Sequence, residues 1–521
     1  MRTLNKKGMI LVRFRKKLTA LVLAAATAGT LAVTASADEP YTGYLYDWWN
    51  DPIPSQCGFV VDRTVSGADM GIGSLAEPND IYIDNDSGKF YIADSKNNRI
   101  VVTDESFSTE NTTVIDTLYY GEAFPEEQST IKKTGFSAPT GVYVRTDKDD
   151  HTLIYVADSA NQRVVAFSEE LEIEMEYVRP SSDVYDKDVT YNPSKVVVDS
   201  AFNVYVVVPS ITQGTVQFSA DGTFNGYYGA NRVNATAEVI AQSFWKLIYT
   251  REQIIAMRRS VAIEIANVDV DEEGFIYTVT ESRTSDTDIL KKLNPAGTNI
   301  FTNLGYDQYI YGDALSIYYK GKTYTSAICD VDIDEEGNIY LLDFATGRVF
   351  QYTDECDLLF IFGGKGTQKG TFTSVSALET HNGKVYVTDS RKNNITVFKG
   401  TEFGSIVQNA ITLYNEGLYD EAKEPWEEVL RRDGNYWLAY IGLGNAYLNQ
   451  NDYKTALDYF YRNSRGGYNR AFKSYRIEFI RANFTWILVT ILVVILALII
   501  FSKVRQYRKK HAQNKTGGTK K

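Results

Sequence analysis

One phrase recurs along this chain and constrains its fold more than any other feature. It consists of a turn, a short apolar strand that contains a Tyr, an Asp, a polar hairpin and another strand. Because apolar residues alternate with period 2 and Asp, Asn and Gly cluster between the runs, each copy predicts strands joined by hairpins. Four copies are clear and two are weaker: Ile83–Val102, Ile154–Val165, Ile333–Gln351 and Gly383–Phe398, then Val198–Phe218 and Val270–Leu293.

The number and spacing of the copies predict a mainly β fold, a six-bladed β-propeller over residues 57–403. The strand Tyr residues that mark the copies lie 46 to 72 residues apart. A four-stranded blade needs roughly 40–50 residues, so the longer spacings predict inserted loops. We expect Gly58–Val61 to pair with the last blade, because an unclosed edge strand is a liability. The marker residues are Tyr91, Tyr155, Tyr205, Tyr277, Tyr340 and Tyr386.

The hairpin segments Ala93–Arg99 (ADSKNNR) and Ala157–Arg163 (ADSANQR) resemble the NHL-repeat family. The glycine-rich stretch Phe362–Phe372 looks like the connector between blades of that family. The resemblance covers about residues 57–400 and is loose in the third and fourth copies, where Val208 and Thr280 replace the Asp. It implies a six-bladed propeller that serves as a binding scaffold.

The N-terminal segment has the pattern of an export signal. Seven basic residues without an acid precede the apolar run Leu18–Val33, and Ala35-Ser36-Ala37 follows. This pattern favours a cleavable signal peptide over residues 1–37 rather than an uncleaved anchor. Residues 38–56 then form an N-terminal extension before the propeller.

Near the other end, residues 482–502 carry no charge. At about 1.5 Å per residue a helix of this length spans roughly 30 Å, the thickness of a bilayer core. The basic tail 503–521 is expected in the cytoplasm. With the signal peptide, this predicts a single-pass cell-membrane protein of a bacterial surface, with its N-terminal domain outside. The net charge is −12 although both ends are basic, so the acidic central part argues against a nucleic-acid partner.

After Phe403 the apolar period changes from 2 to 3.6, which predicts helices over residues 404–481. Gly442–Leu448 looks like the first-helix signature of tetratricopeptide repeats. The resemblance implies two repeats and a capping helix that offer a surface to peptides or partner proteins; a plain spacer is the alternative. Three pairs of residues recur 34 positions apart: Tyr419 and Tyr453, Ala422 and Ala456, Trp426 and Phe460.

Residues 235–263 break the strand pattern. Apolar residues spaced three and four apart predict one or two amphipathic helices inserted between blades. Such an insert serves as a lid, a partner-docking element or plain packing. If a propeller face is functional, we expect Phe244, Trp245 and Tyr249 to contact the ligand or partner.

Two further patterns have both a functional and a structural interpretation. An Asp followed five residues later by an Arg occurs three times. The pairs could form a ring of charges around a site, or each pair could brace its own hairpin. The repetition of the pair favours the brace. Two Asp-rich stretches resemble the start of a calcium loop, but strands flank them, which favours hairpin turns. The positions are Asp94/Arg99, Asp158/Arg163 and Asp343/Arg348, and the stretches are Asp269–Gly274 and Asp332–Gly337.

The sequence favours a binder over an enzyme and predicts no catalytic residue, no metal ligand and no cofactor, with Ca²⁺ or another divalent ion as the alternative. His151 and His381 are the two His residues outside the tail, too few for a three-His zinc site. An acid-only metal site on the propeller axis would need residues from four blades, which no sequence window reveals. A Cys329–Cys356 bridge is left open.

The leading hypothesis is a membrane-anchored, extracytoplasmic binding and assembly protein. Its propeller and helical repeats would engage a protein partner, such as a transporter or another membrane complex, or a glycan. The alternative is a metal-dependent lactonase-like or polysaccharide-acting enzyme, as in some propellers that resemble this one. A purely structural surface protein is the third hypothesis.

Overall fold

The computed structural model describes residues 40–47, 50–121, 133–186, 188–231, 263–281, 289–301, 311–463 and 465–516. The chain divides into two compact units. The first contains the residues up to Gly43 and Phe59–Lys399, and the second contains Tyr44–Gly58 and Gly400–Lys521. The predicted signal peptide and nearly all of the helical insert, with Phe244, Trp245 and Tyr249, lie outside the described residues.

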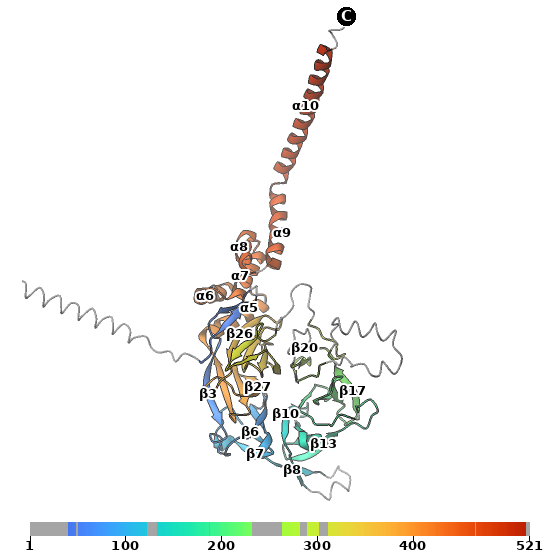
Figure 1. Ribbon diagram of the computed structural model, residues 1–521, viewed down its shortest axis with the longest axis vertical. Coiled ribbons are helices and arrows are strands. Elements are labelled where there is room, and N and C mark those ends of the chain that lie inside the picture. The colour runs from blue at the N-terminus through green and yellow to red at the C-terminus, as the bar shows by residue number, and fades with distance from the viewer. Residues whose placement is uncertain are drawn as a thin grey trace, which may run out of the picture. The chain divides into compact units, whose positions relative to one another are not determined.

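The first unit is a six-bladed β-propeller, which confirms the predicted fold class. In the first five blades the consecutive blade strands pair antiparallel in chain order, so each of these blades is a meander (Figure 1). The first blade contains β4 (Pro78–Asp84), β5 (Lys89–Asp94), β6 (Arg99–Thr103) and β7 (Thr113–Ile115); the second contains β10 (Pro139–Thr146), β11 (Thr152–Asp158), β12 (Arg163–Ser168) and β13 (Glu172–Val178), extended by β8 (Thr117–Tyr120) and β9 (Lys133–Gly135).

The third to fifth blades follow the same plan. They contain β14 (Lys195–Val198), β15 (Val204–Val207), β16 (Gly214–Phe218) and β17 (Phe224–Gly229); β18 (Asn267–Val270), β19 (Ile276–Val279) and β20 (Leu290–Leu293); and β23 (Ile328–Ile333), β24 (Ile339–Asp343), β25 (Arg348–Tyr352) and β26 (Leu358–Gly363). A separate hairpin consists of β21 (Ile317–Tyr319) and β22 (Lys322–Tyr324).

The sixth blade closes the ring with a strand from the start of the chain. It consists of β27 (Val375–His381), β28 (Lys384–Asp389), β29 (Asn394–Gly400) and the N-terminal strand β3 (Phe59–Ser66). This confirms the closure expected from Gly58–Val61. Phe59 stacks on Phe362 of the fifth blade with ring centroids 4.6 Å apart, so the closing strand also packs against the neighbouring blade.

The Tyr of the recurrent phrase is a core residue. It lies on the second strand of each blade, and all six copies are almost fully buried. Large aromatic side chains at equivalent positions pack between neighbouring sheets and add to the apolar burial there.

The Asp–Arg pair acts as a hairpin brace in the first two blades. Asp94 accepts hydrogen bonds from Arg99 Nε at 2.7 Å and Asn97 Nδ2 at 2.8 Å. Asp158 does the same with Arg163 Nε at 2.9 Å. In the fifth blade the arrangement differs, because Arg348 pairs with Asp313 from the preceding loop.

The second unit is helical, with consecutive helices packed pairwise. Residues 34 positions apart in sequence occupy equivalent buried positions, as Ala422 and Ala456 or Trp426 and Phe460 do. The Cα of Gly442 faces Trp426, and a Cβ on Gly444 would lie 2.6 Å from Phe460 Cε1. The helices are α5 (Glu402–Asn415), α6 (Lys423–Arg432), α7 (Trp437–Asn449), α8 (Tyr453–Asn463), α9 (Arg465–Ala482) and α10 (Phe484–Thr516).

The segment Tyr44–Gly58 folds with the helices. It forms the small hairpin of β1 (Tyr44–Tyr46) and β2 (Pro52–Pro54). Asp433, after α6, accepts hydrogen bonds from Ser55 Oγ at 2.7 Å and the Gln56 backbone N at 3.1 Å. The part of the N-terminal extension that the structure describes up to Gly43 belongs instead to the propeller unit.

Helix α10 is long and apolar enough to cross a membrane over Phe484–His511, and an 18-residue window within it has a mean hydropathy of 3.1. Its apolar side chains are exposed. The predicted span 482–502 overlaps this stretch except for Ala482, the last residue of α9, and Asn483 at the junction.

Candidate functional site

The propeller axis is surrounded by the first strands of the six blades, β4, β10, β14, β18, β23 and β27, each of which contacts the next around the ring. The inner edge of such a strand carries backbone groups without a neighbouring strand, and these must be satisfied by side chains or water. The axial side chains lie at alternate positions, because a strand repeats every two residues.

The first axial layer consists of Asp80, Lys195 and Asp330. Lys195 Nζ lies 2.7 Å from Asp80 Oδ1, and both side chains are nearly buried. The other Asp80 oxygen accepts a hydrogen bond from the Val142 backbone N at 2.8 Å. Asp330 accepts one from the Leu378 backbone N at 2.7 Å. These carboxylates therefore join neighbouring blades at the axis.

Burial dominates the electrostatics of this layer. It raises the pKa of Asp330 to about 7, although the positive charge of Lys195 opposes the shift. Burial also raises the pKa of Asp80 against the effect of Lys195. For Lys195 itself, burial lowers the pKa but the charges of Asp80 and Asp330 outweigh it, so the pKa is raised. Lys195 thus stays protonated as the counter-charge of the layer.

The second axial layer lies two residues further along the strands and consists of Asp269, Asp332 and Glu379. Asp332 Oδ2 accepts a hydrogen bond from the Thr380 backbone N at 2.8 Å. The Glu379 side chain has neither a hydrogen bond nor an ion pair within the described part of the chain, and the residue is only 8% exposed. Burial, then the charge of Asp332, raises the pKa of Glu379 and of Asp269. Burial raises that of Asp332 to about 6.

Two tyrosines complete this layer from the first two blades. The rings of Tyr82 and Tyr143 lie 4.7 Å apart, tilted by 46°. Tyr82 Oη donates a hydrogen bond to the Val144 carbonyl at 3.2 Å. Burial, and then the charges of Tyr143, Glu379, Asp84 and Asp269, raise the pKa of Tyr82. We call the three carboxylates and two tyrosines the axial cup.

The next aspartates along the strands cap hairpins. Asp271 Oδ1 accepts a hydrogen bond from the Phe275 backbone N at 2.8 Å, and Asp334 Oδ1 accepts one from Asn338 at 2.8 Å. Gly274 and Gly337 have positive φ of 85° and 82°, which the turns require. The two calcium-like stretches are therefore hairpin turns, as favoured by the sequence. Among the residues that the structure describes, no group of three or more His, Cys, Asp or Glu could hold a metal ion.

The polar partners of His151 and His381 are residues outside the axial cup. His151 Nε2 lies 2.9 Å from Glu174 Oε1, and His381 Nδ1 lies 2.7 Å from Asn85 Oδ1. Cys329 and Cys356 are free thiols, so the bridge that the sequence left open does not form.

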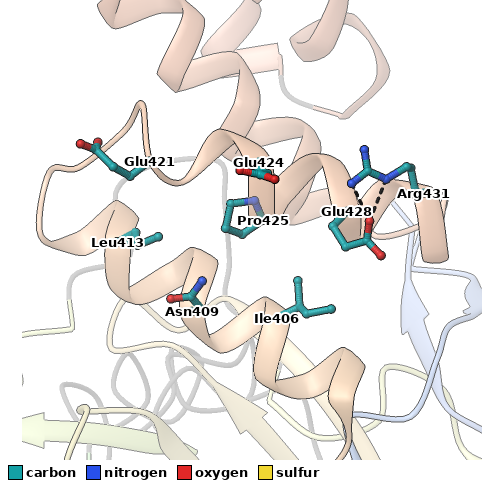
Figure 2. Close-up of a pocket in the computed structure, with 8 residues that line it drawn as sticks. All are labelled: Ile406, Asn409, Leu413, Glu421, Glu424, Pro425, Glu428 and Arg431. Carbon is teal, nitrogen blue, oxygen red and sulfur yellow. Dashed lines mark hydrogen bonds and ion pairs between the residues drawn. The ribbon is translucent and has the colours of Figure 1, made fainter.

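A second candidate site is an open groove in the helical unit, with a volume of about 480 Å³. Figure 2 shows α5 and α6 contributing side chains to it, with Arg431 paired to Glu428. Arg431 Nε lies 2.7 Å from Glu428 Oε2. The carboxylates of Glu421 and Glu424 are exposed and form no ion pair within the described residues. The groove is lined by Ile406, Asn409, Leu413, Glu421, Glu424, Pro425, Glu428 and Arg431.

Sequence reasoning did not single out the axial cup. Its signal is present in the first strands, where polar residues recur at alternate positions when the strands are aligned. The aligned triplets are Asp80-x-Tyr82-x-Asp84, Asn267-x-Asp269-x-Asp271 and Asp330-x-Asp332-x-Asp334.

Comparisons with known proteins agree with the repeat pattern. Residues 75–102 match the NHL repeat family model. No curated protein sequence matches the chain. A streptogramin B lyase structure is similar over 67% of this chain and 100% of its own, with 10% identity and a TM-score of 0.39.

Two further solved structures are similar at the same low level. A putative gluconolactonase aligns over 69% of this chain and 98% of its own, with 11% identity and a TM-score of 0.35. The extracellular domain of a putative one-component system from B. thetaiotaomicron aligns over 68% of this chain and 45% of its own, with 10% identity and a TM-score of 0.35. At these values the similarities carry no argument about function.

Proposed function

We propose that this protein is a single-pass, membrane-anchored binding and assembly protein whose propeller and helical unit lie outside the cytoplasm. The apolar helix α10 supports the anchor. The signal-like segment 1–37 and the basic tail 503–521 support the orientation. On this proposal the chain engages a protein partner, such as a transporter or another membrane complex.

The observation that carries the proposal is the groove between α5 and α6. Ile406, Leu413 and Pro425 give it apolar surface, while Glu421 and Glu424 add unpaired negative charge. Helical repeats of the tetratricopeptide type, which residues 405–466 resemble, bind peptide segments on such surfaces. A partner segment with apolar side chains and Lys or Arg fits this chemistry.

Phe244, Trp245 and Tyr249 remain a proposal for a second contact, on the propeller. They lie outside the described residues, so the groove is the better first target for mutation.

Mild crosslinking in native membranes, followed by affinity purification and mass spectrometry, tests the proposal. We expect a reproducible partner that the double variant Glu421→Lys/Glu424→Lys loses at least tenfold. The matched control is Glu335→Lys/Glu336→Lys, which makes the same charge change at two exposed propeller positions. Equal recovery with both double variants, or no partner with the wild type, would contradict the proposal.

A further inference from the structure

We propose that residues 472–482, the second half of helix α9, bind anionic phospholipid headgroups of the bilayer that α10 crosses. We call these residues the juxtamembrane segment. Lys473, Arg476 and Arg481 are the cations that bind the lipid phosphates. This inference rests on the anchor in the proposed function and is independent of the helical groove. It adds a lipid class that the binding and assembly role does not name.

The first argument is that the described part of the protein leaves this segment uncovered. The start of α9 packs on α8, where Ala471 is buried in a cluster with Ala456 and Phe460. From residue 472 to residue 482 every residue is exposed except Ser474, which is half-buried. An exposed apolar surface of this kind marks contact with a protein or a membrane. Its large apolar residues are Phe472, Tyr475, Ile477, Phe479 and Ile480.

The second argument is the place of the segment next to the membrane span. Asn483 alone separates α9 from α10 (Figure 1). The Asn483 backbone N donates to the Phe479 carbonyl at 3.1 Å, and the Ile487 backbone N donates to the Asn483 carbonyl at 2.9 Å. Helical hydrogen bonds therefore continue across the junction. At about 1.5 Å per residue, Arg476 lies roughly 9 Å before the uncharged stretch, which is comparable to the depth of the headgroup layer.

The third argument is the charge of α9. The helix contains five basic residues and one acidic residue, Glu478. The side chains of Lys473, Arg476 and Arg481 form no ion pair with any residue that the structure describes. A guanidinium group binds phosphate oxygens through paired hydrogen bonds, and a Lys binds them as a point charge. Unpaired cations beside a span therefore favour anionic over zwitterionic headgroups.

The fourth argument favours a lipid surface over a protein partner. At 3.6 residues per turn, Phe472, Tyr475 and Phe479 share one stripe of the helix, and the rings of Tyr475 and Phe479 lie 6.5 Å apart. Ile477 and Ile480 lie outside this stripe, at helical positions between the cations. A helix that docks on a protein needs a single apolar face, whereas lipid surrounds a helix on all sides. Aromatic rings and long basic side chains both suit the membrane–water interface.

Hydrogen exchange measured by mass spectrometry tests the inference on the full-length protein in lipid nanodiscs. One set of discs contains phosphatidylcholine alone, and the other contains phosphatidylcholine mixed with phosphatidylglycerol of the same acyl chains. We expect the backbone amides of residues 472–482 to exchange at least about threefold more slowly in the anionic discs, because bound headgroups reduce local opening of the helix.

Neutral variants of the cations locate the effect. Lys473→Gln/Arg476→Gln/Arg481→Gln should abolish the difference between the two kinds of disc, because it removes the charges and keeps the apolar side chains. Arg476→Lys/Arg481→Lys keeps the charges and should keep most of the difference. All of these side chains are exposed, so the variants are expected to fold, and exchange in α5–α8 and the propeller checks this in the same experiment.

A matched control separates headgroup binding from the general effect of an anionic surface. The control makes the same charge change at three exposed propeller positions and should retain the wild-type difference. Because the anionic surface lowers the local pH equally for both triple variants, the comparison between them isolates headgroup binding. The control variant is Lys148→Gln/Lys320→Gln/Lys322→Gln.

Equal exchange of residues 472–482 in both kinds of disc, or an equal response of the two triple variants, would overturn the inference. Protection that is the same in both lipids and rises with the number of chains per disc would also overturn it, since a second copy would then cover the segment. Residues 484–502 are the internal reference. If their amides exchange freely, the anchor and this inference both fail; if they are protected while residues 472–482 do not respond to lipid charge, only this inference fails.

Discussion

Lys195 of the third blade and Asp80 of the first blade form an ion pair across the propeller axis, with 2.7 Å between Nζ and Oδ1. The two residues belong to blades that are not neighbours, since the second blade lies between them in the ring. Asp80 also holds the second blade through the Val142 backbone N. One buried carboxylate thus connects three blades at the centre.

The first prediction concerns this pair. Lys195→Met should lower the free energy of unfolding by about 3–5 kcal/mol, because it leaves buried carboxylates without their counter-charge. Equilibrium urea unfolding measures the change. Lys89→Met is the control, since Lys89 pairs with Glu169 at 2.6 Å on the surface and should cost at most about 1 kcal/mol. Similar losses in both variants would contradict the axial role of Lys195.

The second prediction concerns pH. Asp330 and Asp332 have pKa values raised to about 7 and about 6, whereas an Asp in an unfolded chain has a pKa of about 3.9. The folded state therefore holds more protons between about pH 4 and 7. The contribution of these groups to the free energy of unfolding falls as pH rises through that window.

Glu379→Gln isolates this effect, because burial raises the pKa of Glu379 as well. Exposed carboxylates with lowered pKa values, such as Asp69, make the protein more stable as pH rises and so oppose this effect. The measured quantity is therefore the difference in stability between the variant and the wild type at each pH. Thermal unfolding should show Glu379→Gln gaining stability relative to wild type from pH 5 to pH 8. A constant difference across this range would show that Glu379 is already ionised in the folded state, so that its pKa is not raised.

The third prediction concerns the hairpin brace. Asp158 accepts hydrogen bonds from the Ser137 backbone N at 2.7 Å and from Arg163 Nε at 2.9 Å, and it is fully buried. Asp158→Ala should cost about 3 kcal/mol, because both buried donors lose their acceptor. Asp221→Ala, at an exposed turn where Asp221 caps Thr223, should cost less than about 1 kcal/mol. Urea unfolding measures the loss of unfolding free energy in each variant. Equal losses would contradict the role of Asp158 as a hairpin brace.

The fourth prediction concerns the helical unit. A Cβ on Gly442 would collide with the Trp426 indole, whereas a Cβ on Gly434 would meet nothing within 4 Å. Gly442→Ala should destabilise the helices by about 1–2 kcal/mol, since overpacking exceeds the gain in helix propensity. Limited proteolysis should then cut within α5–α8 faster than in Gly434→Ala and leave the propeller fragment intact. Identical cleavage rates would mean that the helices do not pack at Gly442.

The blades could be predicted from the sequence because their determinants are local. Alternating apolar residues such as Ile81 and Ile83, and turns with Asp and Gly, specify each meander within a few tens of residues. The closing strand was also predictable, since Phe59–Ser66 has no partner elsewhere and a ring needs one. The helices α5–α8 follow from the change of period after Phe403.

The axial cup could not be predicted in the same way. Asp269, Asp332 and Glu379 lie in separate copies of the repeat, and the sequence favours a hairpin turn where Asp269 and Asp332 begin a calcium-like stretch. Only ring closure brings them together. The same holds for the contact of Ser55 with Asp433, which are 378 residues apart, and for Asp313, which pairs with Arg348 from an irregular loop.

The closing strand β3 has a consequence for the order of events during synthesis. β3 is made before any other strand of the propeller, but its partner β29 is made last, so the ribosome delivers the two on the order of tens of seconds apart. During that delay β3 presents an unpaired edge of the kind that promotes aggregation. Asp62 and Arg63 in its centre keep the waiting strand polar. After closure the same residues change their role, since Asp62 pairs with Lys399 at 2.9 Å and Arg63 lies over the Phe107 ring.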